Sequence, residues 1–549
     1  MTDPTIRRWK ARDSDRLLCG VMNTATESIV SVSGVGLTTA DVVSVARDNW
    51  SVSLGAAARV DMQRCADLIE GFVTSDRPVY GVTTGFGALA NTAIASARTA
   101  ELQVALVRSH AAGMGDEVER EVVRAMLLLR ARSLAMARSG ARPELVDLQL
   151  AMLNAGLTPV VREHGSLGAS GDLAPLSHCA LALLGEGEVR SRDGQLMKSA
   201  QALGEAGLRP VVLRAKEGLA LINGTDGILG MLVLAIHDLE HLAVAADISA
   251  AMTVEGLLGT DRAFAADLQA LRPQVGQAIS ASNLRRLLAD SPIVASHRTG
   301  DSRVQDAYSL RCTPQVHGAA LDTIAHARTI AERELDAAID NPMILPDGRV
   351  ESCGNFHGAP LGFVCDFLAI AVSELSAIAE RRTDRMLDVA RSHGLPPFLA
   401  TDAGVNSGYM IGHYTQAAMA MENKRLAVPA SVDSLPTSAM QEDHVSNGWA
   451  AARKLRRAID NLRRILAVEI VCAGAALELR APLKPGPGTG AALESLRTAV
   501  AGPGKDRWLS PELCAAERLL ADGELVAAVE AAIGRLDVIR SDLNRSEGN

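Results

Sequence analysis

Apolar side chains recur at helical spacing over much of the chain. Two stretches show this pattern most clearly, each stepping by four, three and four residues. One consists of Val122, Met126 and Leu129 and ends at the small polar Ser133, and the other consists of Leu455, Ile459, Leu462 and Leu466. Such spacing places the apolar side chains on one face of an α-helix. Similar patterns cover residues 229–258, 315–339 and 361–385. The sequence therefore predicts a mainly α protein with a long central helical bundle.

Shorter patterns predict a smaller mixed domain before the bundle. Residues 30–35 and 50–54 are β-prone, and Thr39 or Asp41 could cap a helix between them. Residues 482–490 are rich in proline and glycine and predict a loop after the bundle. We therefore expect a poorly ordered tail over residues 1–28, an N-terminal domain over 29–222, the bundle over 223–480, and a C-terminal loop with helices over 481–549.

Composition narrows the class of protein. The 549 residues carry a formal net charge of −9, which argues against nucleic acid or an anionic membrane as the main partner. Eight scattered cysteines without a Cys-x-x-Cys pair indicate reduced thiols and a cytoplasmic protein. The most apolar stretch, residues 230–248, contains five ionisable side chains, so we expect a buried helix rather than a membrane span.

The most unusual chemistry lies in Gly165-Ser-Leu-Gly-Ala-Ser-Gly-Asp-Leu-Ala-Pro-Leu-Ser-His178. Its centre, Ala169-Ser170-Gly171, consists of small residues whose backbone atoms can approach closely. The amide nitrogen of Gly171 could attack the carbonyl carbon of Ala169 with loss of one water. Loss of the Ser170 hydroxyl as a second water would leave a methylidene-imidazolone, which is an electrophile. The plain alternative is a Gly/Ser loop before a helix that starts at Leu173.

Other residue sets could line a site, although each also has an ordinary structural explanation. Asn223 could be only a turn residue, and Phe356 only a core residue. Gln305, Tyr308 and Arg311 lie three apart, so on a helical turn they would share one face. The alternative for this set is a solvated helix face.

The long string around Ala169-Ser170-Gly171 resembles the signature of the aromatic amino acid ammonia-lyases and aminomutases. A serine-hydrolase elbow would need Gly-x-Ser-x-Gly, which this segment lacks. The resemblance covers about residues 29–540 and implies an L-aspartase/fumarase-like fold. It also implies a methylidene-imidazolone (MIO) formed autocatalytically from Ala169-Ser170-Gly171, with no metal and no nucleotide, and a homotetramer with shared active sites.

The resemblance also implies roles for individual side chains. Tyr80 would be the base that removes the β-proton, with Tyr308 as a second catalytic residue, and Arg311 would hold the substrate carboxylate. The substrate-binding set would comprise His110, Asn223, Gln305, Arg311, Phe356 and Glu442. Ser109-His110 and Gln441-Glu-Asp-His444 are similar to the pairs in members that act on histidine. We therefore expect elimination of ammonia from L-histidine to trans-urocanate, the first step of histidine degradation.

Three alternatives stay open at this point. The same residues would serve a tyrosine or phenylalanine ammonia-lyase or a 2,3-aminomutase. His237-Asp-Leu-Glu-His241 fits the His-x-x-Glu-His pattern of a zinc metallopeptidase. A helical scaffold without catalysis would leave the Ala-Ser-Gly context unexplained. Ala105 and Asn447 depart from the family pattern, and either could shift specificity.

Overall fold

The computed structural model describes residues 29–73, 84, 94–301 and 303–539. The described chain is mainly helical, and this confirms the predicted fold class. It divides into two compact units. The first unit contains the described residues up to Met231, together with Glu332–Ala359 and Asp433–Trp449. The second unit contains Leu232–Ala331, Pro360–Val432 and the described residues from Ala450 onward.

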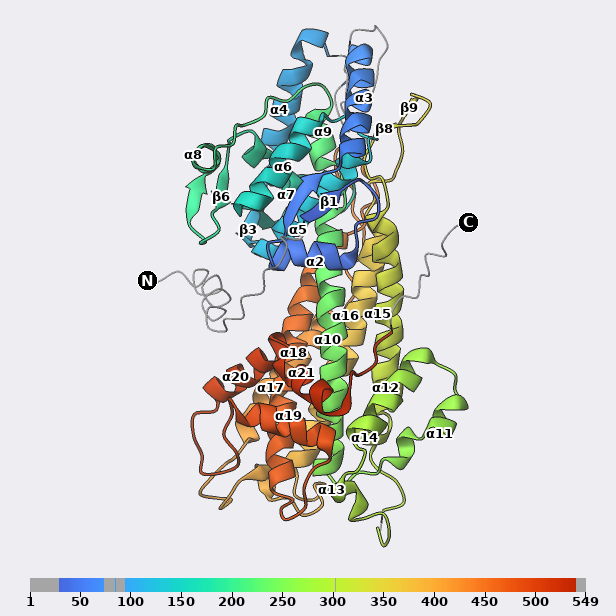
Figure 1. Ribbon diagram of the computed structural model, residues 1–549, viewed down its shortest axis with the longest axis vertical. Coiled ribbons are helices and arrows are strands. Elements are labelled where there is room, and N and C mark those ends of the chain that lie inside the picture. The colour runs from blue at the N-terminus through green and yellow to red at the C-terminus, as the bar shows by residue number, and fades with distance from the viewer. Residues whose placement is uncertain (1–28, 74–83, 85–93, 302, 540–549) are drawn as a thin grey trace. The chain divides into compact units, whose positions relative to one another are not determined.

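The first unit combines helices with short strands (Figure 1). Its helices are α2 (Thr39–Arg47), α3 (Ala56–Val73), η2 (Ser96–Arg98), α4 (Thr99–His110), α5 (Arg120–Ala135), α6 (Pro143–Ala155), α7 (Leu173–Leu183), α8 (Ser199–Glu205) and α9 (Glu217–Ile222). Helix α5 is buried from Glu121 to Ala135 and packs against α2 and α6. Helices α4, α7 and α9 pack on one another.

The strands of the first unit form four small sheets. β1 (Ile29–Val32) pairs in parallel with β2 (Ser51–Leu54), and this confirms the predicted β-prone segments. The antiparallel pairings are β3 (Met114–Glu117) with β5 (Arg162–His164), β4 (Thr158–Pro159) with β6 (Glu188–Arg190), β6 with β7 (Leu196–Lys198), and β8 (Met343–Ile344) with β9 (Val350–Glu351). These strands are too short to form a core of their own.

Four long helices run through much of the chain: α10 (Asp226–Gly256), α15 (Thr313–Leu335), α16 (Ala359–Leu387) and α18 (Gly448–Glu478). The second unit also contains η3 (Arg262–Phe264), α11 (Ala266–Ala270), α12 (Val275–Leu287), α13 (Pro292–Ala295), α14 (Tyr308–Arg311), η4 (Pro397–Leu399), α17 (Met410–Leu426), α19 (Pro487–Arg497), α20 (Ser510–Ala521) and α21 (Glu524–Ile533). The predicted long helices therefore exist, with boundaries shifted by a few residues.

Buried polar contacts join the long helices inside the second unit. His317 Nδ1 of α15 lies 2.8 Å from Asp247 Oδ1 of α10. Arg382 of α16 pairs with Glu469 of α18, and Thr253 of α10 donates to the same carboxylate at 2.9 Å. These buried ionisable side chains thus have partners, as is needed when charges leave water.

Two local expectations need correction. The cap of α2 is Thr38, not Thr39 or Asp41: its hydroxyl accepts from the Asp41 amide, and the Asp41 carboxylate accepts from the Thr38 amide. This reciprocal capping box depends on a residue before the first helical position. The expected loop over 482–490 ends earlier, because α19 begins at Pro487. Proline suits a first helical position, where its missing N–H leaves no bond unmade.

Two helical stretches of the described chain, Glu217–Gly256 and Ala359–Leu387, are long and apolar enough to cross a membrane by composition alone. The apolar window of the first is fully buried inside the protein. This burial is what the five ionisable residues in 230–248 led us to expect of a core helix.

The cap of α2 leads to a test. Thr38→Ala should weaken the start of this helix by about 1 kcal/mol, because the Asp41 amide loses its acceptor. Hydrogen exchange at the Asp41 amide should then become about fivefold faster, the factor that this energy corresponds to. Thr38→Ser retains the hydroxyl and should exchange like the parent. Equal exchange in all three proteins would show that the box does not hold the helix.

Candidate active site

The predicted ring-forming segment lies between β5 and α7, and at Gly171 it passes where no side chain fits. Gly171 adopts a left-handed backbone with φ of 75°, and a Cβ built on it would lie 2.2 Å from the carbonyl oxygen of Gly224. The amide of Asp172 donates to the same oxygen at 2.7 Å. Only glycine permits both the conformation and this approach.

Two distant loops hold the start of the segment. The carbonyl of Gly168 accepts from Ser446 Oγ at 2.9 Å and from the amide of Gly358 at 3.1 Å. The carbonyl of Leu167 accepts from the amide of Asn447 at 2.8 Å. Asn447 has φ of 51°, a left-handed conformation that asparagine tolerates better than most residues. Its backbone explains an asparagine at this position without reference to substrate specificity.

Ser170 and Glu442 meet within this unit although they are far apart in sequence. The half-buried Ser170 donates its Oγ to Glu442 Oε1 at 3.3 Å. Thr437 Oγ1 donates to the other carboxylate oxygen at 3.1 Å. Glu442 is therefore oriented from one side while its other oxygen faces the segment centre, next to the buried Ala169.

His110, the last residue of α4, is within electrostatic reach of Glu442. Its Nδ1 lies 2.9 Å from the carbonyl oxygen of Leu106, so Nδ1 carries the proton and donates it. Burial lowers the pKa of His110 from its usual value, against the opposing effects of the Leu106 carbonyl and the Glu442 charge. This shift favours the neutral imidazole, in which Nε2 is an acceptor.

Asn223 and Phe356 also lie in the first unit. Asn223 ends α9 and is only 3% exposed, and its Nδ2 donates to Asp340 Oδ1 at 3.2 Å and to the Asn341 carbonyl at 3.0 Å. Phe356 is half-buried in a turn before α16.

Asp172, which directly follows the ring-forming residues, was not among the predicted site residues. It is fully buried, and its carboxylate accepts from the amides of Gly227 and Ile228 at 2.9 and 3.0 Å and from Ser166 Oγ at 2.8 Å. Burial raises the pKa of Asp172 to about 7, although these hydrogen bonds oppose the shift. One feature of the sequence could have indicated this role: Asp172 is an acidic residue directly after the ring-forming segment, and acidic side chains bind well to the N–H groups at helix starts.

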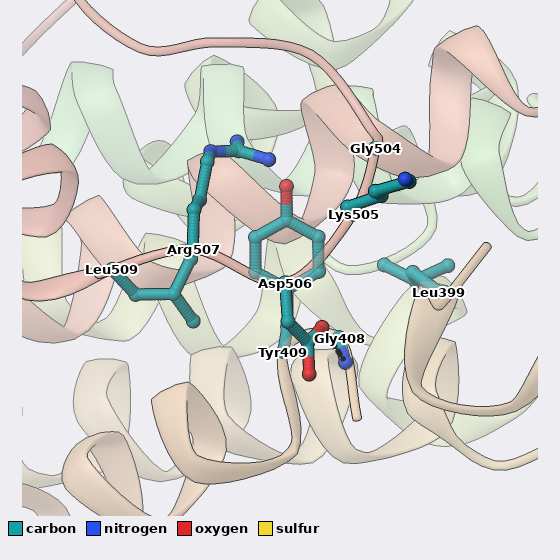
Figure 2. Close-up of a pocket in the computed structure, with 8 residues that line it drawn as sticks. All are labelled: Leu399, Gly408, Tyr409, Gly504, Lys505, Asp506, Arg507 and Leu509. Atoms are coloured by element: carbon teal, nitrogen blue, oxygen red, sulfur yellow. Dashed lines mark hydrogen bonds between the residues drawn. The ribbon is translucent and has the colours of Figure 1, made fainter. Parts of the chain in front are cut away.

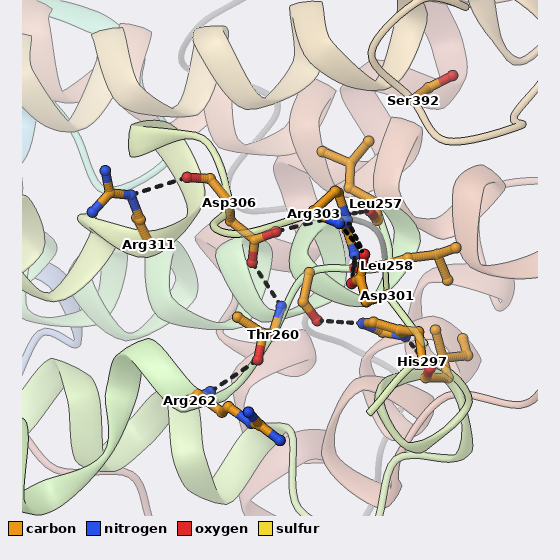
Figure 3. Close-up of polar contacts among 12 residues, drawn as sticks. Leu257, Leu258, Thr260, Arg262, His297, Asp301, Arg303, Asp306, Arg311 and Ser392 are labelled. Carbon is orange, nitrogen blue, oxygen red and sulfur yellow. Dashed lines mark hydrogen bonds and ion pairs between the residues drawn. The ribbon is translucent and has the colours of Figure 1, made fainter. Parts of the chain in front are cut away.

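Gln305, Tyr308 and Arg311 lie in the second unit. Figure 3 shows Arg311 beside Asp306. Arg311 donates Nε to the Asp306 carbonyl at 3.0 Å, and its Cζ lies 4.6 Å above the ring of Tyr308, which is 70% exposed. The expected shared helical face is only partly correct, because α14 begins at Tyr308 and Gln305 precedes it. Asp306, which precedes this helix, accepts a hydrogen bond from the amide of Thr260 at 2.7 Å.

Two further regions contain none of the residues predicted for the lyase site. A small cavity of the second unit is lined by Tyr409 and residues 504–507 among others (Figure 2). Burial raises the pKa of the Tyr409 phenol.

His237 and His241 lie edge to face with ring centroids 4.8 Å apart. Within the described part of the chain, they belong to no group of three or more metal-binding side chains. Tyr80 lies outside the described residues.

Known proteins match this chain both in sequence and in structure. The family model for aromatic amino acid lyases matches residues 37–498. A histidine ammonia-lyase of Streptomyces griseus is 57% identical over 510 residues, covering 92% of this chain and 99% of that protein. The tyrosine aminomutase structure from Streptomyces globisporus has a TM-score of 0.88 at 36% identity, with 93% of this chain and 100% of that chain covered. The histidine ammonia-lyase structure from Trypanosoma cruzi has a TM-score of 0.85 at 36% identity, with 95% and 100% covered.

The fold and these matches define a carbon–nitrogen lyase. The chain belongs to the aromatic amino acid lyase family, as the segment around Ser170 led us to expect. The zinc-peptidase alternative has less support, because the lyase match includes both His237 and His241.

The close approach at Gly171 gives a prediction. Gly171→Ala should abolish activity and lower the melting temperature, because the new methyl group overlaps the Gly224 carbonyl and the backbone is left-handed. Gly207→Ala is the matched control: it has φ of 71° but nothing within 4 Å of the added Cβ. The control should keep its activity and lose only the conformational cost of about 1–2 kcal/mol. Equal effects of the two substitutions would contradict the steric argument.

Proposed function

We propose that this protein is a histidine ammonia-lyase, which converts L-histidine to trans-urocanate and ammonia in the first step of histidine degradation. The observation that carries the proposal is Glu442, which lies 3.3 Å from Ser170 and whose charge acts on His110. The name of the Streptomyces griseus relative supports it. A pocket for phenylalanine or tyrosine would not bury two such polar groups beside the reacting segment.

The residues present fit a methylidene-imidazolone. Position 171 has no room for a Cβ, Ala169 is 6% exposed, and Ser170 retains a half-buried hydroxyl that could leave as water. When formed, this ring supplies the electrophile that makes the substrate amino group a better leaving group. The proposal includes no metal and no nucleotide cofactor.

Glu442 and His110 would select the side chain of the substrate. Glu442 is an acceptor, and neutral His110 offers Nε2 as a second acceptor because its Nδ1 donates to Leu106. Two acceptors suit an imidazolium, in which both ring nitrogens carry protons. The positive charge of that imidazolium would acidify the adjacent β-C–H and so assist its removal.

The remaining roles follow the family resemblance. We assign β-proton removal to Tyr80, with Tyr308 as a further catalytic side chain, and contacts with substrate to Gln305, Asn223 and Phe356. Arg311 would bind the carboxylate: only its Nε is bonded among the described residues, which leaves the two Nη atoms for a bidentate contact.

We further propose a homotetramer whose active sites are shared between chains. One face of α16 exposes Phe363, Phe367 and Ile370 by 49%, 45% and 44%, at the spacing of a helix stripe. Exposed apolar stripes of this kind mark association surfaces, and a second copy would cover it. A cytoplasmic location agrees with the seven cysteines of the described chain, all of which are free.

The ring can be tested by mass. The purified parent should weigh two water molecules less than its sequence predicts, because ring closure and loss of the Ser170 hydroxyl each release one. Ser170→Ala should fold but should lack the two-water deficit, and its activity should fall by orders of magnitude because the electrophile is missing. A parent mass equal to that of the unmodified sequence would reject the imidazolone.

Substrate selection can be tested at Glu442. Glu442→Ala should lower kcat/KM for histidine by about 10- to 150-fold, because a hydrogen bond to a charged group contributes about 1.5–3 kcal/mol. Asp443→Ala removes the neighbouring exposed carboxylate and is the matched control, with parental activity expected. The measurement is kcat/KM for histidine and phenylalanine in all three proteins. A parent that prefers phenylalanine would reject histidine as substrate but not the lyase chemistry.

A further inference from the structure

An ion pair lies completely buried in the first unit, close in sequence to the candidate site. Lys216 Nζ contacts Asp340 Oδ2 at 2.7 Å, and both side chains are 0% exposed. Lys216 precedes α9 in a left-handed conformation with φ of 65°. Charges of this kind are costly to remove from water, and an apolar pair of similar size is often as stable. The proposed mechanism uses neither residue.

The Asp340 carboxylate determines which way the amide of Asn223 points. Oδ1 of Asp340 accepts from Asn223 Nδ2 at 3.2 Å and from the amide of Asn341 at 2.7 Å. Asn223 Nδ2 also donates to the carbonyl of Asn341 at 3.0 Å. Both hydrogens of the amide are therefore used. A flipped amide would place its oxygen against a carboxylate and a carbonyl, so a single orientation remains.

This orientation leaves a buried acceptor without a donor. Oδ1 of Asn223 is buried and bonds to no donor among the described residues. A buried acceptor without a partner is unfavourable, and an N–H group of a bound molecule would relieve that cost. Asn223 is followed by Gly224, whose carbonyl contacts position 171. Asn223, which carries the unpaired oxygen, is thus the neighbour of Gly224, and Gly224 contacts the ring-forming segment.

We propose that Lys216 and Asp340 are positioning residues that lock Asn223 so that its Oδ1 accepts an N–H from the α-amino group of the substrate. Lys216 fixes and neutralises the carboxylate, and the carboxylate fixes the amide. The inference rests on the proposed function in one respect: the substrate brings an amino group to Ser170. It does not require that the amino acid be histidine.

A double-mutant cycle tests whether the pair acts through Asn223. Lys216→Met/Asp340→Leu removes the acceptor of the amide without leaving an unpaired charge. It should lower kcat/KM by about 10- to 100-fold, the effect expected when a reacting group is slightly misplaced. In an Asn223→Ala background the same change should alter kcat/KM by no more than about twofold, because the group to be positioned is already absent. Losses that multiply would overturn the proposal.

A second measurement separates positioning from general damage. An analogue of the substrate that lacks the amino group should inhibit the parent and the apolar-pair variant with equal Ki, because it makes no bond to Asn223. A Ki that rises as much as kcat/KM falls would mean that the whole pocket is distorted, and it would overturn the proposal. If the apolar pair does not fold, Lys216→Met/Asp340→Ala removes the same acceptor with less bulk and replaces it in both measurements.

The matched control is the ion pair Arg382–Glu469 of the second unit, also 0% exposed on both sides. The effect of Arg382→Met/Glu469→Leu should multiply with that of Asn223→Ala. Melting temperature and the two-water mass deficit report folding and ring formation in every variant. The cycle uses whichever amino acid the parent deaminates best. A failure of the histidine assignment is therefore visible in the parent alone, separately from a failure of the positioning proposal.

Discussion

The close approach of two backbones, at Gly171 and Gly224, is the constraint on which the first unit depends. A Cβ at position 171 would meet the Gly224 carbonyl at 2.2 Å, and a Cβ at position 224 would meet the Arg130 guanidinium at 2.0 Å. Gly171 therefore packs on Gly224, and Gly224 packs on the Arg130 side chain. A side chain at either glycine would move the ring-forming segment away from the start of α10.

Buried ionisable side chains surround this contact. Arg130 pairs with Asp226 at 3.1 Å, with side-chain exposures of 1% and 2%. Asp172 pairs with no cation among the described residues, and burial together with the nearby Asp226 raises its pKa to about 7, against hydrogen bonds that stabilise the ionised form. A carboxyl group with this pKa exchanges its proton near neutral pH. The region therefore combines close backbone packing with a carboxyl group, Asp172, whose pKa depends on nearby charges and hydrogen bonds.

The sequence predicted what depends on local pattern. The long helices and the β1–β2 segments follow from periodicity, which acts over a few residues. The cap at Thr38 and the start of α19 at Pro487 were missed by one to several residues, since boundaries depend on single hydrogen bonds. Motif resemblance nominated both Ser170 and Glu442, which the fold brings to 3.3 Å across 272 residues. The Lys216–Asp340 pair, 124 residues apart, has no local signal, because two isolated charges look solvated until the fold buries them.

In the candidate site, short loops provide the hydrogen-bond partners for one another's backbone groups. The carbonyls of Leu167 and Gly168 have no partner in a helix or sheet of their own, and they are bonded by the amides and hydroxyl of Gly358, Ser446 and Asn447. A buried loop without such partners would leave polar backbone groups unpaired. Each loop is therefore stable only when the others are in place. Because the partners lie far apart in sequence, closing this arrangement carries a larger loop-closure entropy than forming a local helix. The chemistry assigned to Ser170 consequently depends on the completed tertiary structure and not on the Ala-Ser-Gly sequence alone.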